Sequence, residues 1–147
     1  MEKPNKAVEI LKKSGWDISR NIDISVYEKA YKSEGYNLSE LNIEFLKRFG
    51  GLDIIIPAFR RPKSTDKIYI DPIRGVNGIY RGNVLDYEER IGKSVVVIGE
   101  TQNEQLVLLM SENGEFYVAF DDYLAKLGNN IYEVLDTFCE SKQPIEV

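Results

Sequence analysis

The sequence predicts an α+β fold in which a mostly antiparallel sheet has helices packed on one side. Three observations favour this class: helical spacing of apolar residues in the first third, short β-branched runs after Gly51, and a helical segment near the end. The chain has 147 residues, 43% of them hydrophobic and 29% charged, which is typical of one globular domain. No repeat, low-complexity stretch or linker divides it, so we expect a single domain over residues 1–147.

Three helices are predicted in the first third, over residues 7–15, 25–35 and 39–51. Ser25 and Glu28 have the spacing of a capping box at the start of the second helix, and a glycine suits the left-handed conformation at its end. The third helix begins at a serine within a hydrophobic staple and ends at a Gly-Gly pair. Its predicted buried stripe consists of Leu41, Phe45, Leu46 and Phe49.

Strands are predicted in most of the rest of the chain, where short β-branched runs are bounded by turn residues. They cover residues 52–56, 67–70, 94–98, 105–111 and 115–120. Asn113-Gly114 joins the last two strands and favours a type I′ hairpin turn, because both residues tolerate positive φ. Asp71 is expected to cap the turn that Pro72 imposes.

The remaining segments are predicted as one loop and two helices. Residues 75–82 hold three glycines and are expected to form the loop, after which Asn83 caps a short helix that ends at Ile91. A last helix starts at Asn130 and runs to about Glu140. With helices on one side, the other face of the sheet is expected to stay partly open to solvent, which suits recognition.

The sequence contains no histidine and a single cysteine, Cys139. Without histidine, Ser-His-Asp and Cys-His catalysis and histidine-dependent metal hydrolysis are excluded. One cysteine allows neither an internal disulfide nor a cysteine-rich zinc site, and its helical spacing from apolar residues predicts that Cys139 packs in the core. We therefore expect no metal, no cofactor and no enzyme activity.

No apolar run approaches the roughly 20 residues that a membrane helix needs. The longest such runs are residues 95–98 and 106–110, and the first residues are charged and polar rather than an apolar signal segment. We expect a cytoplasmic protein with no membrane partner.

Acidic side chains concentrate in the second half of the chain. Residues 83–147 carry thirteen acidic and four basic side chains, whereas residues 1–82 carry eleven acidic and fifteen basic ones. An acidic surface repels nucleic acid and attracts a basic partner. The alternative is that these carboxylates only keep the protein in solution. The one basic cluster, residues 60–63, is interpreted as a solvated loop rather than a phosphate site.

Two acidic segments that each contain a tyrosine are the candidate partner-binding residues. They are Asp86, Tyr87, Glu88, Glu89 and Asp121, Asp122, Tyr123. Carboxylates steer a basic partner, and tyrosine adds rigid contact area with a polar tip. The alternative is a solvated helix start and a strand-end turn. Paired carboxylates can also catalyse hydrolysis or hold magnesium, but these residues and Glu100 show no recognised spacing for it.

Several short stretches, in order along the chain, resemble the SUKH superfamily, in particular its third subfamily. They are Gly15-Trp16 with Arg20 and Asp23, Phe45-Leu46-x-x-Phe49-Gly50-Gly51-Leu52, Ile70-Asp71-Pro72, Ile98-Gly99-Glu100, Glu112-Asn113-Gly114 before Tyr117, and Leu127-Gly128. The similarity covers nearly the whole chain. Val97 stands where many members have proline, and the glycine that often follows the last helix is absent.

The resemblance implies an immunity protein, which binds the C-terminal domain of a cognate polymorphic toxin, often a nuclease, and neutralises it. A regulatory scaffold or adaptor is the alternative, a carboxylate-dependent hydrolase is a third, and a homo-oligomer stays open. The family landmarks are expected to be mainly structural: Trp16 in the core, Arg20 paired with an acidic group, and Gly50-Gly51 in a turn. Phe49, Asp71, Pro72, Gly99 and Glu100 complete this set.

Overall fold

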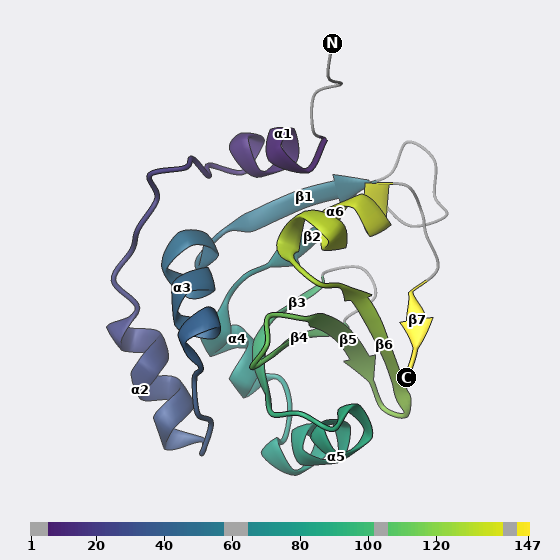
Figure 1. Cartoon of the computed structure of the whole chain (residues 1–147). Helices are drawn as coiled ribbons and strands as arrows, with labels where there is room; N and C mark the ends of the chain where they lie inside the picture. Colours follow the sequence, from purple (N-terminus) through teal and green to yellow (C-terminus); the bar gives the residue numbers. More distant parts are fainter. Residues whose placement is uncertain (1–5, 58–64, 102–105, 140–143) are drawn as a thin grey trace.

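The computed structural model describes residues 6–57, 65–101, 106–139 and 144–147. In these residues the chain forms six helices and a seven-strand antiparallel sheet (Figure 1). The helices are α1 (Lys6–Lys13), α2 (Ser25–Ser33), α3 (Glu40–Phe49), α4 (Pro72–Asn77), α5 (Arg81–Ile91) and α6 (Ile131–Cys139). The strands are β1 (Asp53–Pro57), β2 (Thr65–Tyr69), β3 (Val95–Thr101), β4 (Val107–Ser111), β5 (Phe116–Phe120), β6 (Tyr123–Gly128) and β7 (Ile145–Glu146). The predicted α+β class and antiparallel sheet are confirmed.

The strands lie in the sheet in the order in which they occur in the sequence, from β1 to β7. Each therefore pairs with its neighbour along the chain, and α4 and α5 connect β2 to β3. A register shift between Val97 and Gly99 marks a bulge in β3. Bulges bend a strand and increase its twist, which helps the sheet to curl.

The first two strands have helices on one side only. Ile54 and Ile56 of β1 are buried on the side where α1 and α6 contact this strand, whereas Ile55 between them is 52% exposed. The face that was expected to remain partly open is therefore present on β1 and β2.

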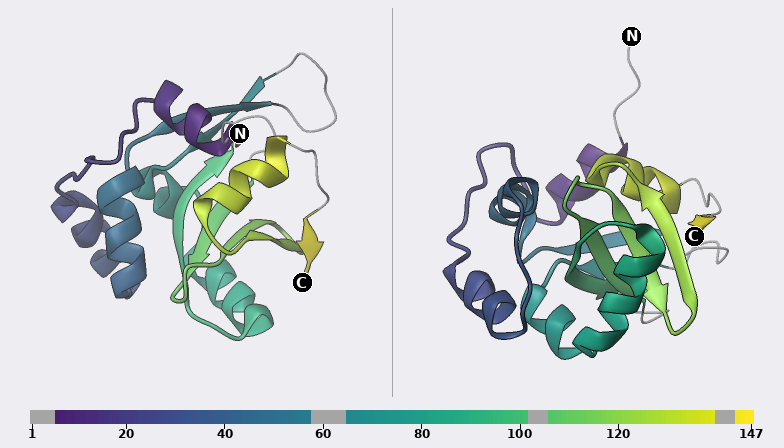
Figure 2. Two further views of the ribbon diagram at one scale, coloured as in Figure 1. Left: turned by 45° about the horizontal axis from the view of Figure 1, so that its top comes forward. Right: turned by 60° about the horizontal axis from the view of Figure 1, so that its bottom comes forward.

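Both faces of β3, β4 and β5 are covered, because nearly every residue of these strands is buried, so the predicted arrangement with helices on one side holds only for β1 and β2. Figure 2 shows α1 and α6 on one side of the sheet and α5 on the other. On this second side α4 packs so closely on β3 that a Cβ added at Gly75 would lie 2.7 Å from Val97 Cγ1.

The glycine-rich segment predicted as a loop contains α4, so that prediction is wrong. Asp71 is its N-cap and accepts a hydrogen bond from the backbone N–H of Arg74, and Pro72 takes the first helical position. Gly75 lies within this helix, and its close packing on β3 leaves no space for a side chain, which accounts for a glycine in a helix. The next helix, α5, starts at Arg81 after Tyr80, so Asn83 is not its cap.

Two details of the first helices also differ from the prediction. Ser25 is the first residue of α2 and donates to the Asp23 carboxylate, so it forms no capping box with Glu28. In α3, Leu41 is 51% exposed, and the buried position belongs to Asn42. Asn42 forms a capping box with Ser39 and donates from Nδ2 to the main-chain oxygen of Ser111, 3.0 Å away, which fixes the rotation of the helix.

The hairpin between β4 and β5 is not of type I′, because Gly114 has positive φ but Asn113 does not. Instead, the backbone N–H of Gly114 donates to the Ser111 carbonyl and closes a turn, as in three-residue hairpin loops.

Strands β6 and β7 were not predicted. Asp121 and Asp122 form the turn into β6. Cys139 is half-buried at the end of α6. Residues 60–63, 105 and 140 lie outside the described residues.

Candidate functional site

Helix α5 turns one face towards the sheet and the opposite face to solvent. Val84 and Tyr87, three residues apart, are buried on the inner face, and Asp86 and Glu89 are exposed. The Tyr87 hydroxyl donates a 2.7 Å hydrogen bond to the main-chain oxygen of Asp121. This bond ties α5 to the β5–β6 turn, 34 positions further along the chain.

The two predicted acidic segments meet at this contact. A surface hollow of about 460 Å³, here called the acidic hollow, is lined by Asn83, Asp86, Tyr87, Arg90, Asp121 and Asp122. The carboxylates of Asp86, Asp121 and Asp122 are all exposed. The structure thus places three acidic side chains from α5 and from the β5–β6 turn around one opening.

The turn holds its two aspartates in a defined conformation. Phe120 pairs with Tyr123, which leaves Asp121 and Asp122 as the two turn residues. Asp121 has φ of 49°, the one positive value at a non-glycine residue in the described part of the chain. Aspartate and asparagine tolerate this left-handed conformation better than most residues.

Arg90 is the basic side chain of the acidic hollow, and its guanidinium is bound to main-chain oxygens. It donates to the carbonyl of Asp122 and to the main-chain oxygen of Val147, both at 2.8 Å. The cation thereby supports the turn from beneath. Arg90 lies one helical turn after Asp86 on α5 and lines the same hollow. The hollow is therefore lined by three carboxylates and one guanidinium.

The pKa of Tyr87 reflects this environment. Burial raises the pKa of the Tyr87 hydroxyl, and the nearby carboxylates of Asp121, Asp122 and Asp86 raise it further, while Arg90 opposes the effect. Both causes disfavour the phenolate. Tyr87 therefore acts as a neutral hydrogen-bond donor that positions Asp121.

Three of the predicted partner-binding residues do not line the acidic hollow. Glu88 is only 15% exposed; it accepts a 2.8 Å hydrogen bond from the backbone N–H of Val95 and pairs with Arg81. Glu89 is exposed but does not line the hollow, and Tyr123 is half-buried in β6. Glu88 thus has a structural contact, as does the buried Tyr87.

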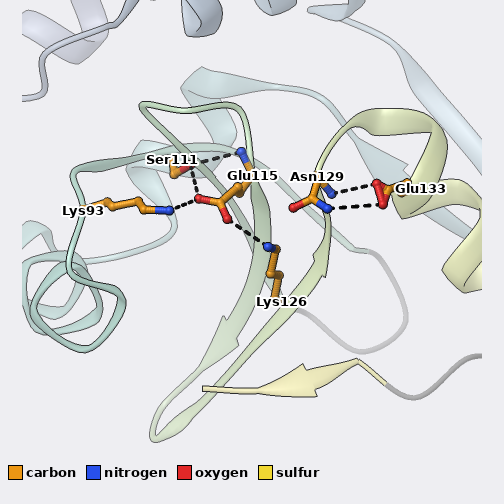
Figure 3. A network of polar contacts seen from close by, with 6 residues as sticks. All are labelled: Lys93, Ser111, Glu115, Lys126, Asn129 and Glu133. Atoms are coloured by element: carbon orange, nitrogen blue, oxygen red, sulfur yellow. Dashed lines mark hydrogen bonds and ion pairs between the residues drawn. The ribbon is translucent and has the colours of Figure 1, made fainter.

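Two lysines, Lys93 and Lys126, are bound to the carboxylate of Glu115, which lies outside the acidic hollow. Glu115 forms ion pairs with Lys93 and with Lys126, the second at 2.8 Å, and contacts the Ser111 hydroxyl (Figure 3). These hydrogen bonds lower the pKa of Glu115. This network lies before the start of β5, whereas Asp121 and Asp122 follow the end of that strand, so neither lysine belongs to the acidic hollow.

Helix α6 is capped beside this network. Asn129 donates to the Glu133 carboxylate (Figure 3). The side chain of Asn130 accepts a hydrogen bond from the backbone N–H of Glu133. The predicted start of the last helix at Asn130 and Glu133 is therefore confirmed.

The first group of family landmarks has structural contacts. The Trp16 ring is 5% exposed and stacks on Phe49 with 5.5 Å between ring centroids, in agreement with the predicted core position. Arg20 was expected to pair with an acidic group, but its Nη2 donates to the Gly50 carbonyl at 2.9 Å. Gly51 has φ of 82°, which supports its predicted turn position.

The second group of landmarks surrounds α4. A Cβ added at Gly99 would lie 1.7 Å from the Tyr69 carbonyl oxygen, so only glycine fits at this crossing of β2 and β3. Glu100, the next residue, pairs with Arg74 of α4. With Asp71 and Pro72 at the start of α4, these residues join the helix to the sheet.

Sequence reasoning did not select Asn83 or Arg90 as parts of the site. Both share a helical face with Asp86 and Tyr87, since the four residues follow the spacing of successive turns in α5. Grouping residues by that spacing would have found them. No local sequence signal shows that α5 lies beside the β5–β6 turn. That placement depends on how strands β3 to β6 pair.

The fold defines the class: an α+β protein with a seven-strand antiparallel sheet, which carries an exposed acidic hollow between α5 and the β5–β6 turn. Within the described residues, no group of three acidic or cysteine side chains could hold a metal ion, and no helix is long and apolar enough to cross a membrane. The chain belongs to the SUKH-3 immunity protein family, which matches residues 3–141. No curated protein and no solved structure matches it significantly.

Membership confirms the family that the landmarks indicated and supplies the function at a general level. Immunity proteins of this family are not enzymes, and they neutralise polymorphic toxins. The chain therefore has a cognate toxin as its partner.

Proposed function

We propose that the protein neutralises its toxin by covering the toxin's active cleft with the acidic hollow and the surface around it. The toxin is a nuclease in this proposal, and binding takes place in the cytoplasm of the cell that makes both proteins. A nuclease binds a polyanion, so its cleft is basic. The carboxylates of Asp86, Asp121 and Asp122 take the place of substrate phosphates and exclude the nucleic acid.

The observation that supports the proposal is the convergence of three exposed carboxylates on one hollow of about 460 Å³. They come from two segments far apart in sequence, and the guanidinium of Arg90, which also lines the hollow, is bound to main-chain oxygens. The acidic potential is therefore available to a partner. Complementary charge of this kind accelerates association and suppresses wrong partners.

The test is the triple variant Asp86→Asn, Asp121→Asn, Asp122→Asn, with binding kinetics measured on the toxic domain of the cognate toxin. Asparagine keeps the shape of each side chain and tolerates the positive φ at position 121. We expect the association rate at low salt to fall about tenfold and to depend less on salt, because electrostatic steering is lost.

The matched control removes three exposed carboxylates elsewhere: Glu9→Gln, Glu28→Gln, Glu34→Gln. It changes the net charge by the same amount, so an equal fall in the association rate would show that only total charge matters. An unchanged association rate in a folded Asp→Asn triple variant would refute the acidic hollow as the binding site.

A further inference from the structure

The exposed side of α3 lies between two hollows, away from α5 and the acidic hollow (Figure 1). The first, here called the apolar hollow, has a volume of about 300 Å³ between α3, the β4–β5 hairpin and the start of α6. The second, the arginine hollow, has about 510 Å³ between α3 and residues 18–21. Glu44 and Arg48 line both, so the two hollows form one continuous surface.

Beneath this surface lies a row of four aromatic rings, here called its floor. Three of them line the apolar hollow, and the fourth, Trp16, lies under Arg48. Phe116 contacts Phe45 edge-to-face at 5.1 Å, Phe45 stacks on Phe49 at 4.9 Å, and Phe49 stacks on Trp16 at 5.5 Å. All four rings are at most 8% exposed and are therefore held rigidly. A rigid floor costs little conformational entropy when a partner binds to it.

Large apolar side chains are exposed at the edges of the same surface. Leu41, beside the apolar hollow, is 51% exposed, and Ile18, beside the arginine hollow, is 81% exposed. Each leaves apolar area in water that a partner could cover. One exposed apolar residue is ordinary, but these two flank two adjoining hollows.

Hydrogen-bond donors without acceptors accompany these apolar residues. Among the described residues, Arg48 makes one hydrogen bond, from Nη2 to the Ile18 carbonyl at 3.3 Å, and its Nε has no partner. Nη1 of Arg20 and Nε1 of Trp16, on the same side of α3, also have none. A buried donor without an acceptor costs about 1–3 kcal/mol. A small rotation of the Arg48 guanidinium, which is half-buried at the boundary of the hollows, would allow it to meet an incoming acceptor.

The charged groups around Arg48 limit what that acceptor is. The arginine hollow contains Arg20, Lys47 and Arg48, and also Glu40 and Glu44. The unused hydrogen-bonding capacity is on the arginines, which only donate. A carboxylate is the acceptor that matches a guanidinium best, because it can accept two parallel hydrogen bonds.

We propose that this face of α3 is a second contact surface for the toxin, which inserts an apolar side chain into the apolar hollow and a neighbouring carboxylate beside Arg48. This inference rests on the proposed function for the identity of the partner. The two surfaces have different tasks. The acidic hollow determines how fast the toxin associates, and the α3 surface determines how slowly it leaves, since buried apolar contacts act mainly on dissociation.

The experiment measures association and dissociation rates of the cognate toxic domain with the variant Ile18→Ala, Leu41→Ala. We expect dissociation at least about tenfold faster and association within about twofold of the unchanged protein. The control Val26→Ala, Ile55→Ala removes apolar side chains that are 67% and 52% exposed on α2 and β1, and both rates should stay the same. Thermal unfolding of each variant checks that it remains folded.

A second variant, Arg48→Met, keeps the long side chain over Trp16 but removes every donor. It should accelerate dissociation about fivefold or more if a carboxylate is bound there. Dissociation within twofold of the unchanged protein in both variants would overturn the proposal, even if the Asp→Asn triple variant slows association as expected. If the α3 variants abolish self-association of this chain and leave toxin kinetics unchanged, the surface belongs to a second copy and the proposal is also wrong.

Discussion

In the region of the family landmarks the side chains are enclosed, whereas in the acidic hollow they are exposed. Trp16 and Phe49 are each 5% exposed, and Gly99 has main-chain atoms where a side chain would be. Asp86 and Asp122 have solvent around their carboxylates. The stretches that indicated the family are therefore those that set the course of the backbone.

This difference separates two kinds of requirement within one chain. Enclosed residues determine whether the fold forms, because a change there creates a clash or a cavity. Exposed carboxylates contribute little to stability and are free to determine which partner binds. Variants in the first region should therefore alter the free energy of unfolding, and variants in the second should alter binding rates.

The strongest test of the enclosed region is Gly99→Ala. The added Cβ would lie 1.7 Å from the Tyr69 carbonyl oxygen, so β2 or β3 must move. We expect the free energy of unfolding to fall by about 3 kcal/mol or more, measured by urea denaturation.

Gly92→Ala is the matched control for this substitution. Gly92 has φ of 81° but no atom within 4 Å of an added Cβ. Its cost is limited to backbone strain of about 1–2 kcal/mol. Equal losses in the two variants would show that crowding at Gly99 is unimportant. A folded Gly99→Ala protein with slower toxin association would break the separation between the two regions.

Tyr87 belongs to both regions, since it is 4% exposed and its hydroxyl positions the Asp121 carbonyl. We expect Tyr87→Phe to lower the free energy of unfolding by about 1 kcal/mol, because one hydrogen bond is lost while the ring remains. Tyr80→Phe is the control, because Tyr80 is 77% exposed and its hydroxyl has no partner within the described part of the chain, so stability should hardly change. Slower toxin association in Tyr87→Phe alone would show that this bond also orders the acidic turn.

Local patterns were sufficient for much of this fold. Helical spacing located α1, α3 and α6, and β-branched runs located β1 to β5, because these signals depend on neighbouring residues. Strand β6 escaped, since Leu124, Ala125 and Lys126 have little strand preference and are extended because β5 pairs with them. Helix α4 escaped because its glycines were interpreted as a loop signal, whereas Gly75 is present because Val97 of a distant strand leaves no room for a side chain.

The site was predictable in its chemistry but not in its geometry. Acidic charge beside a tyrosine selected the segments that contain Asp86, Asp121 and Asp122, which the structure brings together. The same criterion selected Glu88, whose carboxylate is used internally by the backbone N–H of Val95. Composition does not show which way a side chain points in a helix whose predicted cap, Asn83, lies three residues after the observed cap, Tyr80.

The smallest expected effect concerns Glu115. Because its carboxylate is bound to two lysines of the same chain, we expect it to contribute to stability rather than to toxin binding. Its ion pairs with Lys93 and Lys126 lower the pKa of Glu115, so the folded state favours the carboxylate. A lowered pKa stabilises the fold at neutral pH, and this contribution is lost as pH falls through the folded pKa. Since the side chains of this network are partly exposed, we expect less than about 1 kcal/mol.

The measurement is urea denaturation of the unchanged protein and of Glu115→Gln at several pH values. The difference in unfolding free energy should be largest at neutral pH and should shrink below about pH 4, where the carboxyl group is increasingly protonated in the unfolded chain and then in the folded protein. Glu89→Gln, which alters an exposed carboxylate on α5, should change stability little throughout. If Glu115→Gln instead changes toxin association and leaves stability unaltered, the acidic binding surface extends across β5, and exposure alone does not decide which carboxylates bind.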